Sequence, residues 1–358
     1  MSVHVEYFEP ERSAEQAHLR YFNDEMPGYT RRRRGKGFSY FKPTGERITD
    51  VRIINRIKGL VIPPAWTEVW ISPHPKGHIQ AIGRDTKGRK QYIYHSDWRT
   101  TREKEKFVKT LEFARMLPTI REAVTIDMKR PSLEKRTVLA TIVRLLETTL
   151  VRIGNRSYAE QNKSFGLTTL RRRHLKMNGR RLKLEFIGKS GKQHSVELPD
   201  RRAGAIVKQL HDLPGQELFQ YVDEDGNRHA VDSADVNDYL HEIAGGPFTS
   251  KDFRTWAGTV LAAWALSEFE RIDSEAGRRR NIAAAIRKVA GRLGNTPAVC
   301  RSSYIHPEIL HSYMDGSLVE HLKRQIKGQF LKELEGLTSE ETAVYVLLLN
   351  RLEMSEGV

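Results

Sequence analysis

The sequence contains a single cysteine, Cys300, and no long uninterrupted apolar segment. One thiol cannot form a disulfide within the chain and cannot build a zinc site from several cysteines. No apolar run approaches the roughly 20 residues that a membrane-spanning helix requires. Residues 1–15 are polar and acidic, without the apolar core of a signal peptide. We therefore expect a soluble protein of the reducing cytoplasm, with no membrane partner.

Acidic residues are too few to balance the basic ones. The chain has 45 Asp and Glu against 60 Lys and Arg, which gives a formal net charge of +15 at pH 7. Such an excess favours a polyanionic partner, nucleic acid first and an anionic membrane second. No Walker-type loop and no cluster of acidic metal ligands is evident, so the sequence predicts no cofactor and no metal. The 358 residues are 39% hydrophobic, which is enough for ordinary cores and, at this length, for two domains.

The N-terminal part combines a basic run with short β-type segments. Residues 31–36 include four consecutive arginines and a lysine, and an aromatic patch follows at 38–41. Such a run is either a solvated charged surface or a clamp element along DNA phosphates. Residues 47–94 have a strand-rich pattern punctuated by proline and glycine. In the last segment, Tyr92 and Tyr94 share one face beside a basic turn, where they either contact bases or merely cover the sheet.

The change from strand-like to helical patterns predicts an α+β fold in two domains. A charged segment, 98–109, marks the boundary. Residues 1–98 would form a small β-rich domain with a basic extension, and residues 99–358 a larger, mainly α-helical domain. Apolar residues at helical spacing predict a long amphipathic helix over 132–152 at the start of the larger domain.

Residues 174–198 interrupt the helical pattern with a predicted three-stranded antiparallel meander. Asn178-Gly179 is a favoured two-residue hairpin turn, and a second turn follows at 188–192. Apolar residues alternate with polar ones on either side of the second turn, as in half-buried strands. Lys189 lies at the mouth of this turn, where lysines are mostly solvent-exposed.

A helix with a charged first turn follows the meander. Thr249 and Asp252 have the form of a capping box, and the helix they open carries Arg254 in its first turns. An arginine there does not complement the helix dipole, which prefers anions at this end. Arg254 is therefore either functional or an exposed side chain with its stem on Trp256.

Two more helices lead to a tyrosine. The first runs over about 281–293 and ends at Gly294, a favoured residue for a helix stop. The second is capped by Thr296, has Pro297 at its first position and carries Tyr304. A tyrosine in a short helix is ordinarily a packing residue, so its position alone does not assign it a function.

Five positions in order resemble the active site shared by type IB DNA topoisomerases and tyrosine recombinases: Arg152, Lys189, Arg254, Asn295 and Tyr304. The segments that carry the resemblance are Val151-Arg152-Ile153-Gly154, Phe186-Ile187-Gly188-Lys189, Lys251-Asp252-Phe253-Arg254-Thr255-Trp256 and Leu293-Gly294-Asn295-Thr296-Pro297. Within the superfamily, the chain is most similar to the small poxviral and bacterial topoisomerases over about residues 60–315. Lys251-Asp252-Phe253-Arg254-Thr255 and Gly88-Arg89-Lys90-Gln91-Tyr92-Ile93-Tyr94 favour that branch.

One position departs from the common pattern. The superfamily usually has histidine where this chain has Asn295. An amide can still donate a hydrogen bond to a phosphate oxygen, but it cannot carry charge or transfer a proton. The resemblance therefore implies phosphate contact for Asn295, with the proton transfers carried out elsewhere.

The resemblance implies a role for each of the five residues. Tyr304 would attack the phosphodiester and form a 3′-phosphotyrosyl link. Lys189 would protonate the leaving 5′-oxygen, and Arg152 is a candidate to assist this proton transfer. Arg152, Arg254 and Asn295 would stabilise the charge that develops on the phosphate. Religation would need no ATP, and rotation of the free end would relax supercoils of either sign.

The resemblance also implies how DNA is held. A monomer would clamp around double-stranded DNA in the cytoplasm, at the nucleoid. Tyr158 is a candidate contact in the larger domain, although a core position is equally compatible with its sequence context. The candidate contacts of the smaller domain are Lys87, Arg89, Lys90, Gln91, Tyr92 and Tyr94.

Two other functions remain open at the level of sequence. A tyrosine recombinase would use the same five positions, but it normally has histidine where Lys251 stands and a helical N-terminal domain. A non-catalytic DNA-binding protein with a decayed site is the second alternative, and the five intact positions argue against it.

Overall fold

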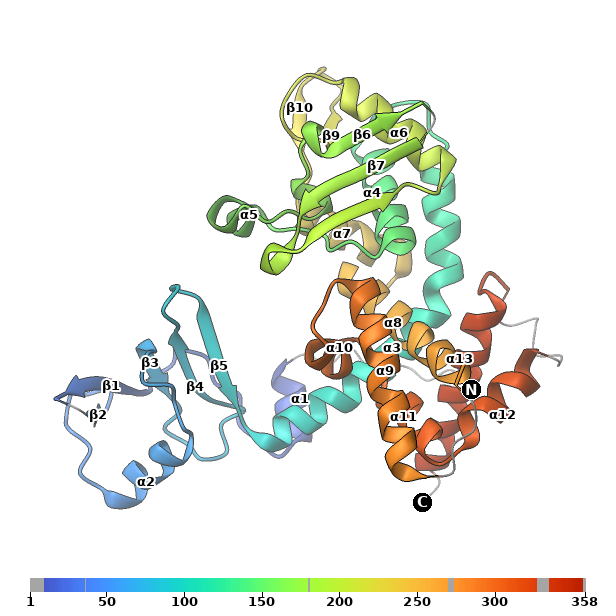
Figure 1. Cartoon of the computed structure of the whole chain (residues 1–358). Helices are drawn as coiled ribbons and strands as arrows, with labels where there is room; N and C mark the ends of the chain where they lie inside the picture. Colours follow the sequence, from blue (N-terminus) through green and yellow to red (C-terminus); the bar gives the residue numbers. More distant parts are fainter. Residues whose placement is uncertain (1–9, 36, 180, 270–273, 327–334, 357–358) are drawn as a thin grey trace. The chain divides into compact units, whose positions relative to one another are not determined.

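The computed structural model describes residues 10–35, 37–179, 181–269, 274–326 and 335–356. Lys36 of the basic run and residues 1–9 of the polar start lie outside these ranges. The chain divides into two compact units, residues 1–109 and 110–358. The first holds an antiparallel sheet and the second is mainly helical, which confirms the predicted α+β fold (Figure 1). None of the described helices has the length and apolar character needed to cross a membrane.

The first unit is built on a five-stranded antiparallel sheet with the strand order β2-β1-β3-β4-β5. Helix α2 packs on it through Ile57, which contributes to a small core with Val69, Ile71 and Ala81. The elements of this unit are α1 (Pro10–Gln16), β1 (Tyr29–Arg34), β2 (Gly37–Phe41), α2 (Val51–Gly59), β3 (Thr67–Ile71), β4 (Ile79–Arg84) and β5 (Lys90–Tyr94).

The four consecutive arginines form strand β1, an element that the sequence pattern did not reveal. Arg31 is half-buried, and its guanidinium donates to the carbonyl oxygens of Ile62, Pro63 and Trp66. Its Cζ lies 4.1 Å from the ring centroid of Phe38. A run of one residue type has no period-two alternation, so the strand is visible only once its partner strands are known.

Helix α2 is an element that the predicted strand-rich pattern of residues 47–94 did not include. Asp50 caps the helix by accepting a hydrogen bond from Arg52 N at 2.8 Å. Ile53 and Ile57 are four residues apart and face the sheet together, which is a helical and not a strand spacing. The later part of the region agrees with the prediction, since it forms β3, β4 and β5.

The charged segment 98–109 is part of a continuous helix, α3 (Ser96–Asp127), and the first compact unit ends within this helix. Trp98 is buried at its start against Leu19 and Ala14. The second unit then begins in the same helix and continues through ten further α-helices and five strands, counted over the described residues.

The second unit surrounds one large hydrophobic core. Its helices are α4 (Lys135–Thr149), α5 (Arg156–Asn162), α6 (Arg201–Asp212), α7 (Ser233–Ala244), α8 (Ser250–Ser267), α9 (Glu275–Leu293), α10 (Pro297–Tyr304), α11 (Pro307–Met314), α12 (Ser317–Ile326) and α13 (Ser339–Glu356). Its strands are β6 (Leu175–Asn178), β7 (Arg181–Ile187), β8 (Gln193–Glu197), β9 (Gln220–Val222) and β10 (Arg228–Ala230). Single 3₁₀ turns lie at η1 (Leu167–Thr169), η2 (Arg172–His174) and η3 (Lys189–Gly191).

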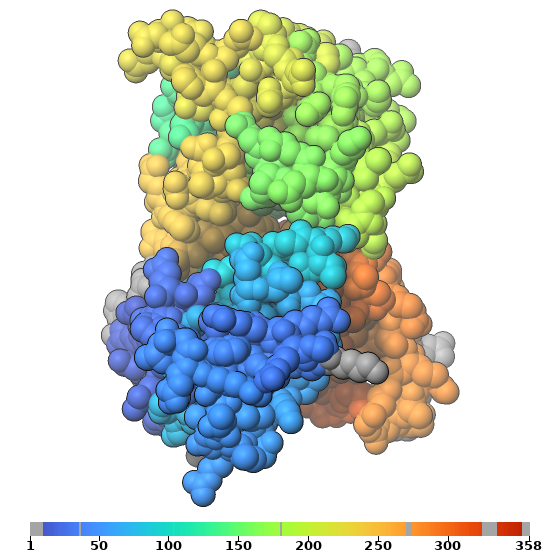
Figure 2. Space-filling view, turned by 90° about the vertical axis from the view of Figure 1, so that its left-hand side faces the viewer, coloured from blue at the N-terminus to red at the C-terminus, as the bar shows by residue number. Residues whose placement is uncertain are grey.

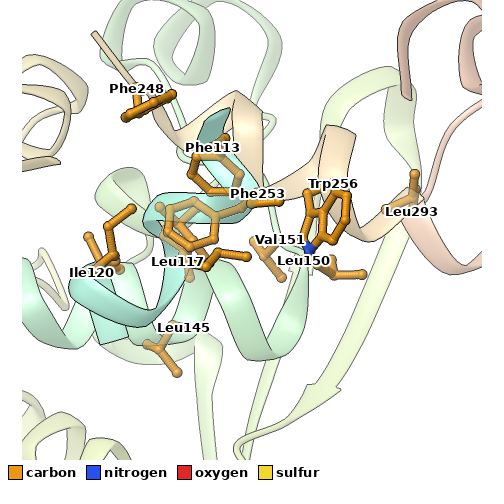
Figure 3. Packing of buried hydrophobic residues seen from close by; sticks show 14 of the residues in the cluster. Phe113, Leu117, Ile120, Leu145, Leu150, Val151, Phe248, Phe253, Trp256 and Leu293 are labelled. Carbon is orange, nitrogen blue, oxygen red and sulfur yellow. The ribbon is translucent and has the colours of Figure 1, made fainter. Parts of the chain in front are cut away.

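The core of the second unit joins α3, α4 and α8. Phe253 and Trp256 of α8 point into it beside Leu150, Val151 and Leu293 (Figure 3). Phe253 packs edge to face on Phe113 of α3, with ring centroids 4.9 Å apart. This packing fixes the start of α8, which carries Arg254, against the ends of α4 and α9.

The predicted helices of the second unit are confirmed, with shifted ends. Helix α4 is shorter than the expected 132–152, because Leu150 adopts a left-handed conformation (φ +57°) that ends the helix. Helix α9 begins at Glu275, before the expected start at 281, since Ser274 caps it by accepting from Gly277 N. The capping box at Thr249 is present, with Thr249 N donating to Asp252 Oδ2 at 2.7 Å.

The three-stranded meander is confirmed as the sheet β6-β7-β8. Asn178, which was expected to lie in the first turn, pairs with Arg181 and so belongs to strand β6. Gly179, at φ +58°, is the residue that leaves the strand. The second turn lies where predicted, between Ile187 and Gln193, which pair with each other.

Candidate active site

Arg152 lies in the loop that follows α4. Its Nη2 donates to the carbonyl oxygen of Gly294 at 3.2 Å and to Oδ1 of Asn295. The loop is held in place by backbone hydrogen bonds from Leu167 N to Arg152 O and from Thr168 N to Ile153 O, of 2.9 and 2.7 Å. The neighbouring Gly154 and Gly166 approach so closely that a Cβ on Gly166 would lie 2.5 Å from Gly154 N. Glycine is therefore required for this loop to present Arg152.

Arg254 is buried, with only 3% of its surface exposed, although it lies in the first turns of α8. Its guanidinium donates to the carbonyl oxygens of Leu150 at the end of α4 and Leu293 at the end of α9, the latter at 2.7 Å. Because helices end with unsatisfied carbonyl groups, one arginine can join both ends. The alternative of an exposed arginine lying on Trp256 is therefore wrong.

Asn295 follows the end of α9, where Gly294 adopts a left-handed conformation at φ +62°. The Asn295 side chain is buried (6% exposed), and its Oδ1 accepts from Arg152. Its Nδ2 is buried without a hydrogen-bond partner in the described part of the chain. Leaving such a donor unpaired costs roughly 1–3 kcal/mol, a cost that an acceptor from outside the protein would remove.

Tyr304 is the last residue of α10, a helix capped by Thr296 as predicted. Helices α8, α9 and α10 pack against one another (Figure 1). A Cβ on Gly258 of α8 would lie 2.5 Å from Tyr304 O, so this glycine lets the backbone of Tyr304 approach α8. Thr259 Oγ1, one residue later, donates to the same oxygen at 3.4 Å.

The charges around Tyr304 favour its phenolate form. Burial alone would raise the pKa of Tyr304, but the charge of Arg254, a hydrogen bond from it, and the charges of Arg152 and Lys251 hold that pKa below its ordinary value. The Cζ of Arg254 lies 5.0 Å from the centroid of the Tyr304 ring. The arrangement places the Tyr304 phenol near two guanidinium groups, and one of these, Arg152, also holds Asn295.

Lys189 is the one predicted site residue that the described contacts do not join to the other four. It is exposed on the turn between β7 and β8, and its Nζ lies 6.0 Å from the ring centroid of Tyr158. Tyr158 is half-buried on α5, and its hydroxyl is close enough to Arg152 to affect the pKa of that residue. Residues of this region, green in the space-filling view, form part of the molecular surface (Figure 2).

The predicted DNA contacts of the first unit lie on β5 and the turn before it. Tyr92 and Tyr94 share one face as predicted, with ring centroids 5.8 Å apart and nearly parallel. Lys87 is exposed, while Lys90 forms an ion pair of 2.6 Å with Asp24.

Asp85 organises the turn itself. The hydrogen bond from Arg89 is the main cause that lowers the pKa of Asp85 to about 2. Gln91 Nε2 donates to the same carboxylate at 3.1 Å. Arg89 and Gln91 are thus already engaged with the protein, which the sequence alone did not show.

Sequence reasoning missed four residues at the site. Lys251 was noted as part of a motif and as a position that separates topoisomerases from recombinases, but not as a site residue, yet its charge acts on Tyr304. Gly258 lies against the backbone of Tyr304. Two residues contact the corner formed by Gly294 and Asn295: Lys192 at the end of the β7–β8 turn, and His194 on β8. Only their spacing from motif residues could have indicated them, since none has a distinctive pattern of its own.

Comparison with known proteins agrees with this geometry. Residues 95–334 match the family described as eukaryotic DNA topoisomerase I, catalytic core, and residues 37–85 match the bacterial DNA topoisomerase IB N-terminal domain. The chain therefore belongs to the type IB DNA topoisomerase family, an enzyme family that acts on DNA.

Its relatives include viral enzymes. DNA topoisomerase 1B of Acanthamoeba polyphaga mimivirus is 35% identical over 305 residues, which cover 83% of this chain and 91% of that protein. DNA topoisomerase 1B of vaccinia virus (strain Copenhagen) is 22% identical over 257 residues, or 70% of this chain and 77% of that protein. Of the three functions that the sequence left open, the family supports the topoisomerase.

Proposed function

We propose that Tyr304 is the nucleophile of a DNA relaxation reaction, with Arg152, Arg254 and Asn295 as phosphate contacts and Lys189 as the general acid. The observation that carries the proposal is that Arg152 and Arg254 both act on the phenol of Tyr304, while Arg152 also holds Asn295, whose amide nitrogen is unpaired in the described structure. Guanidinium groups stay charged at physiological pH and match phosphate oxygens with paired donors. A phenol whose pKa is lowered by such neighbours is a nucleophile ready for phosphoryl transfer.

The reaction conserves the phosphodiester bond. The Tyr304 hydroxyl loses its proton to water and its oxygen forms a bond to the phosphorus at the 3′ end of the cleaved strand, while the bond from that phosphorus to the 5′-oxygen breaks. Lys189 gives a proton to that oxygen, so the products are a 3′-phosphotyrosyl link and a free 5′-hydroxyl. The reverse attack by the 5′-hydroxyl restores the strand and the phenol, and neither direction requires ATP or a metal ion. Between the two steps, the free end rotates and supercoils of either sign relax.

The DNA would be double-stranded and held by a monomer at the nucleoid. In this proposal residues 1–98 form the clamp domain and residues 99–358 the catalytic domain. Exposed Tyr92 and Lys87 support a DNA-contacting surface on the first unit, because ring faces and lysines contact bases and phosphates without sequence preference. Tyr158, beside Lys189, supports a further contact in the second unit. Arg89, Lys90, Gln91 and Tyr94 would complete the surface of the first unit.

Relaxation of supercoiled plasmid in EDTA without ATP tests the proposal. The wild-type protein should relax both positive and negative supercoils, and Tyr304→Phe should relax neither while still binding the plasmid. Tyr313→Phe is the matched control, because this tyrosine is buried in α11 and its hydroxyl accepts from Asn281. Relaxation by Tyr304→Phe would overturn the assignment of the nucleophile, and a requirement for ATP or metal would overturn the rest.

A further inference from the structure

The turn that carries Lys189 is attached to the catalytic corner by a second lysine. Lys192, at the end of the same turn, donates from Nζ to the backbone carbonyl oxygen of Asn295 at 2.8 Å. The two residues are 103 positions apart in sequence. The turn is closed on its other side by Gly188 N, which donates to Lys192 O at 2.7 Å. Lys192 thus connects the base of the turn directly to the residue that contacts Arg152.

His194 makes a second connection between the same two segments. Its ring lies so close to Gly188 that a Cβ there would be 2.6 Å from Cδ2 and Nε2, and a Cβ on Gly294 would be 2.9 Å from Cε1. The ring also stacks on Phe186, with centroids 4.9 Å apart and planes 7° from parallel. The imidazole is therefore fixed between the turn on one side and the Gly294–Asn295 corner on the other.

We propose that Lys192 and His194 are positioning residues, which attach the β7–β8 turn to the Gly294–Asn295 corner and thereby fix where Lys189 delivers its proton. The inference rests on the proposed role of Lys189 as general acid. Lys189 is exposed and has a long flexible side chain, whereas a general acid must reach its target within about 2.6–3.2 Å. The described contacts of Lys189 do not hold its amino group to within this distance. We infer that the attachment of its turn through Lys192 and His194 does so.

The charges around His194 are compatible with such a role. Burial is the main cause that lowers the pKa of His194, followed by the positive charges of Arg152, Arg254 and Lys192. The ring is therefore neutral at pH 7 and can lie among three cations without repulsion. A neutral ring with a fixed orientation is suited to a structural contact between the turn and the corner.

A substrate with sulfur in place of the leaving 5′-oxygen shows whether a variant impairs proton delivery by Lys189 or some other part of the reaction. A thiolate leaves readily without a proton, because a thiol has a pKa near 8.5, far below that of an alcohol. We would measure single-turnover cleavage of a DNA duplex with either a normal phosphodiester or a 5′-bridging phosphorothiolate at the cleaved position. Lys192→Met should cleave the oxygen substrate about tenfold more slowly, the effect of one charge-assisted hydrogen bond. It should cleave the sulfur substrate at the wild-type rate.

Three variants complete the experiment. Lys192→Arg keeps a cationic donor and should recover most of the oxygen rate. Lys183→Met removes a partly exposed lysine of the same sheet, which forms an ion pair with Glu185, and should change neither rate. If His194→Ala folds, it should be slow on the oxygen substrate and normal on the sulfur substrate. If it does not fold, the result for Lys192→Met alone tests the positioning role.

Lys189→Ala distinguishes failure of this inference from failure of the proposed function. If Lys189→Ala cleaves the oxygen substrate normally, the assignment of the general acid is wrong and the inference is wrong with it. If Lys189→Ala is slow on oxygen alone, while Lys192→Met is either unaffected or equally slow on both substrates, only the positioning role is wrong.

Discussion

At the scale of single residues, Asn295 and Arg254 each have a buried nitrogen with no hydrogen-bond partner in the described structure, Nδ2 and Nε respectively. Folding leaves such groups unpaired only at a cost, because water can no longer satisfy them. Both lie next to Tyr304 or to Arg152, where a phosphate would be attacked. In the proposed function, these two nitrogens donate to phosphate oxygens.

Replacing Asn295 by alanine should reduce the rate of strand cleavage on the order of 10²-fold, as removal of one preorganised donor to a developing negative charge does in other enzymes. The affinity for uncleaved DNA should change little, since many other contacts hold the backbone. Single-turnover cleavage and an equilibrium binding titration measure the two quantities. A variant that binds poorly but cleaves normally once saturated would show that Asn295 serves binding only.

The rate of cleavage should depend on pH through Tyr304. Because Arg254, Arg152 and Lys251 hold the pKa of Tyr304 below its ordinary value, the rate should rise with pH and level off below the pH expected for a free phenol. Lys251→Met removes one positive charge, raises the pKa of Tyr304 and should move the midpoint of the profile to higher pH. Lys208→Met, an exposed lysine on α6, is the control. An identical midpoint in all three proteins would contradict the proposed electrostatic role of Lys251.

The sequence predicts which residues assemble at the site, but it does not predict the contacts that position each of them. Arg152, Arg254, Asn295 and Tyr304 were identified by resemblance, and the structure brings them together. The burial of Arg254 between two helix ends could not be predicted, because it depends on where α4 and α9 stop in space. The contacts of Lys192 and His194 depend likewise on segments about a hundred residues away.

At the scale of elements, helices and strands were predicted correctly where the sequence contains a clear cap or a clear alternation of apolar and polar residues. The caps of α8 and α10 and the period-two pattern of the meander gave the correct elements. Strand β1 was missed because four arginines have no alternation, and its character comes from pairing with β2 and β3. Helix α2 was missed because it has only nine residues and lies between segments with strand patterns.

Helix α13 lies beyond the residues that match the catalytic-core family, yet it is tied to the centre of the second unit. Glu341 accepts hydrogen bonds from Arg121 at 2.8 and 3.0 Å and from Trp256 Nε1 at 3.2 Å. Arg121 also contacts Glu147 of α4 at 2.6 Å. One carboxylate therefore joins α13 to α3 and α8, two residues from Arg254.

Glu341→Ala should destabilise the protein by about 2 kcal/mol, because the partly buried Arg121 loses one of its two carboxylate partners and the Trp256 indole loses its acceptor. For a unit of this size, such a loss corresponds to a fall in Tm of about 4–8 °C. Thermal unfolding measures it, and Glu340→Ala is the control, since the neighbouring side chain is exposed. Equal melting temperatures for the two variants would show that the Glu341 contacts do not stabilise α13.

At the scale of the whole molecule, the net charge of +15 should dominate the affinity for DNA. Each phosphate contact releases a counterion, so the binding constant of the Tyr304→Phe protein should fall steeply as salt rises. With on the order of 6–10 phosphate contacts, the loss between 50 and 200 mM salt is about 10³–10⁵-fold. Fluorescence anisotropy with a labelled duplex measures this slope. Affinity that is independent of salt would contradict phosphate-based binding.

If Tyr304 is the nucleophile, it becomes joined to the 3′ end of the broken DNA strand, and the covalent adduct can be mapped. A duplex labelled on the 5′ side of the cleaved bond would be incubated with the protein, denatured, digested with protease and analysed by mass spectrometry. We expect a labelled nucleotide attached through a 3′-phosphate to the peptide that contains Tyr304, and a released strand with a free 5′-hydroxyl. Attachment to another residue, or through a 5′-phosphate, would contradict it.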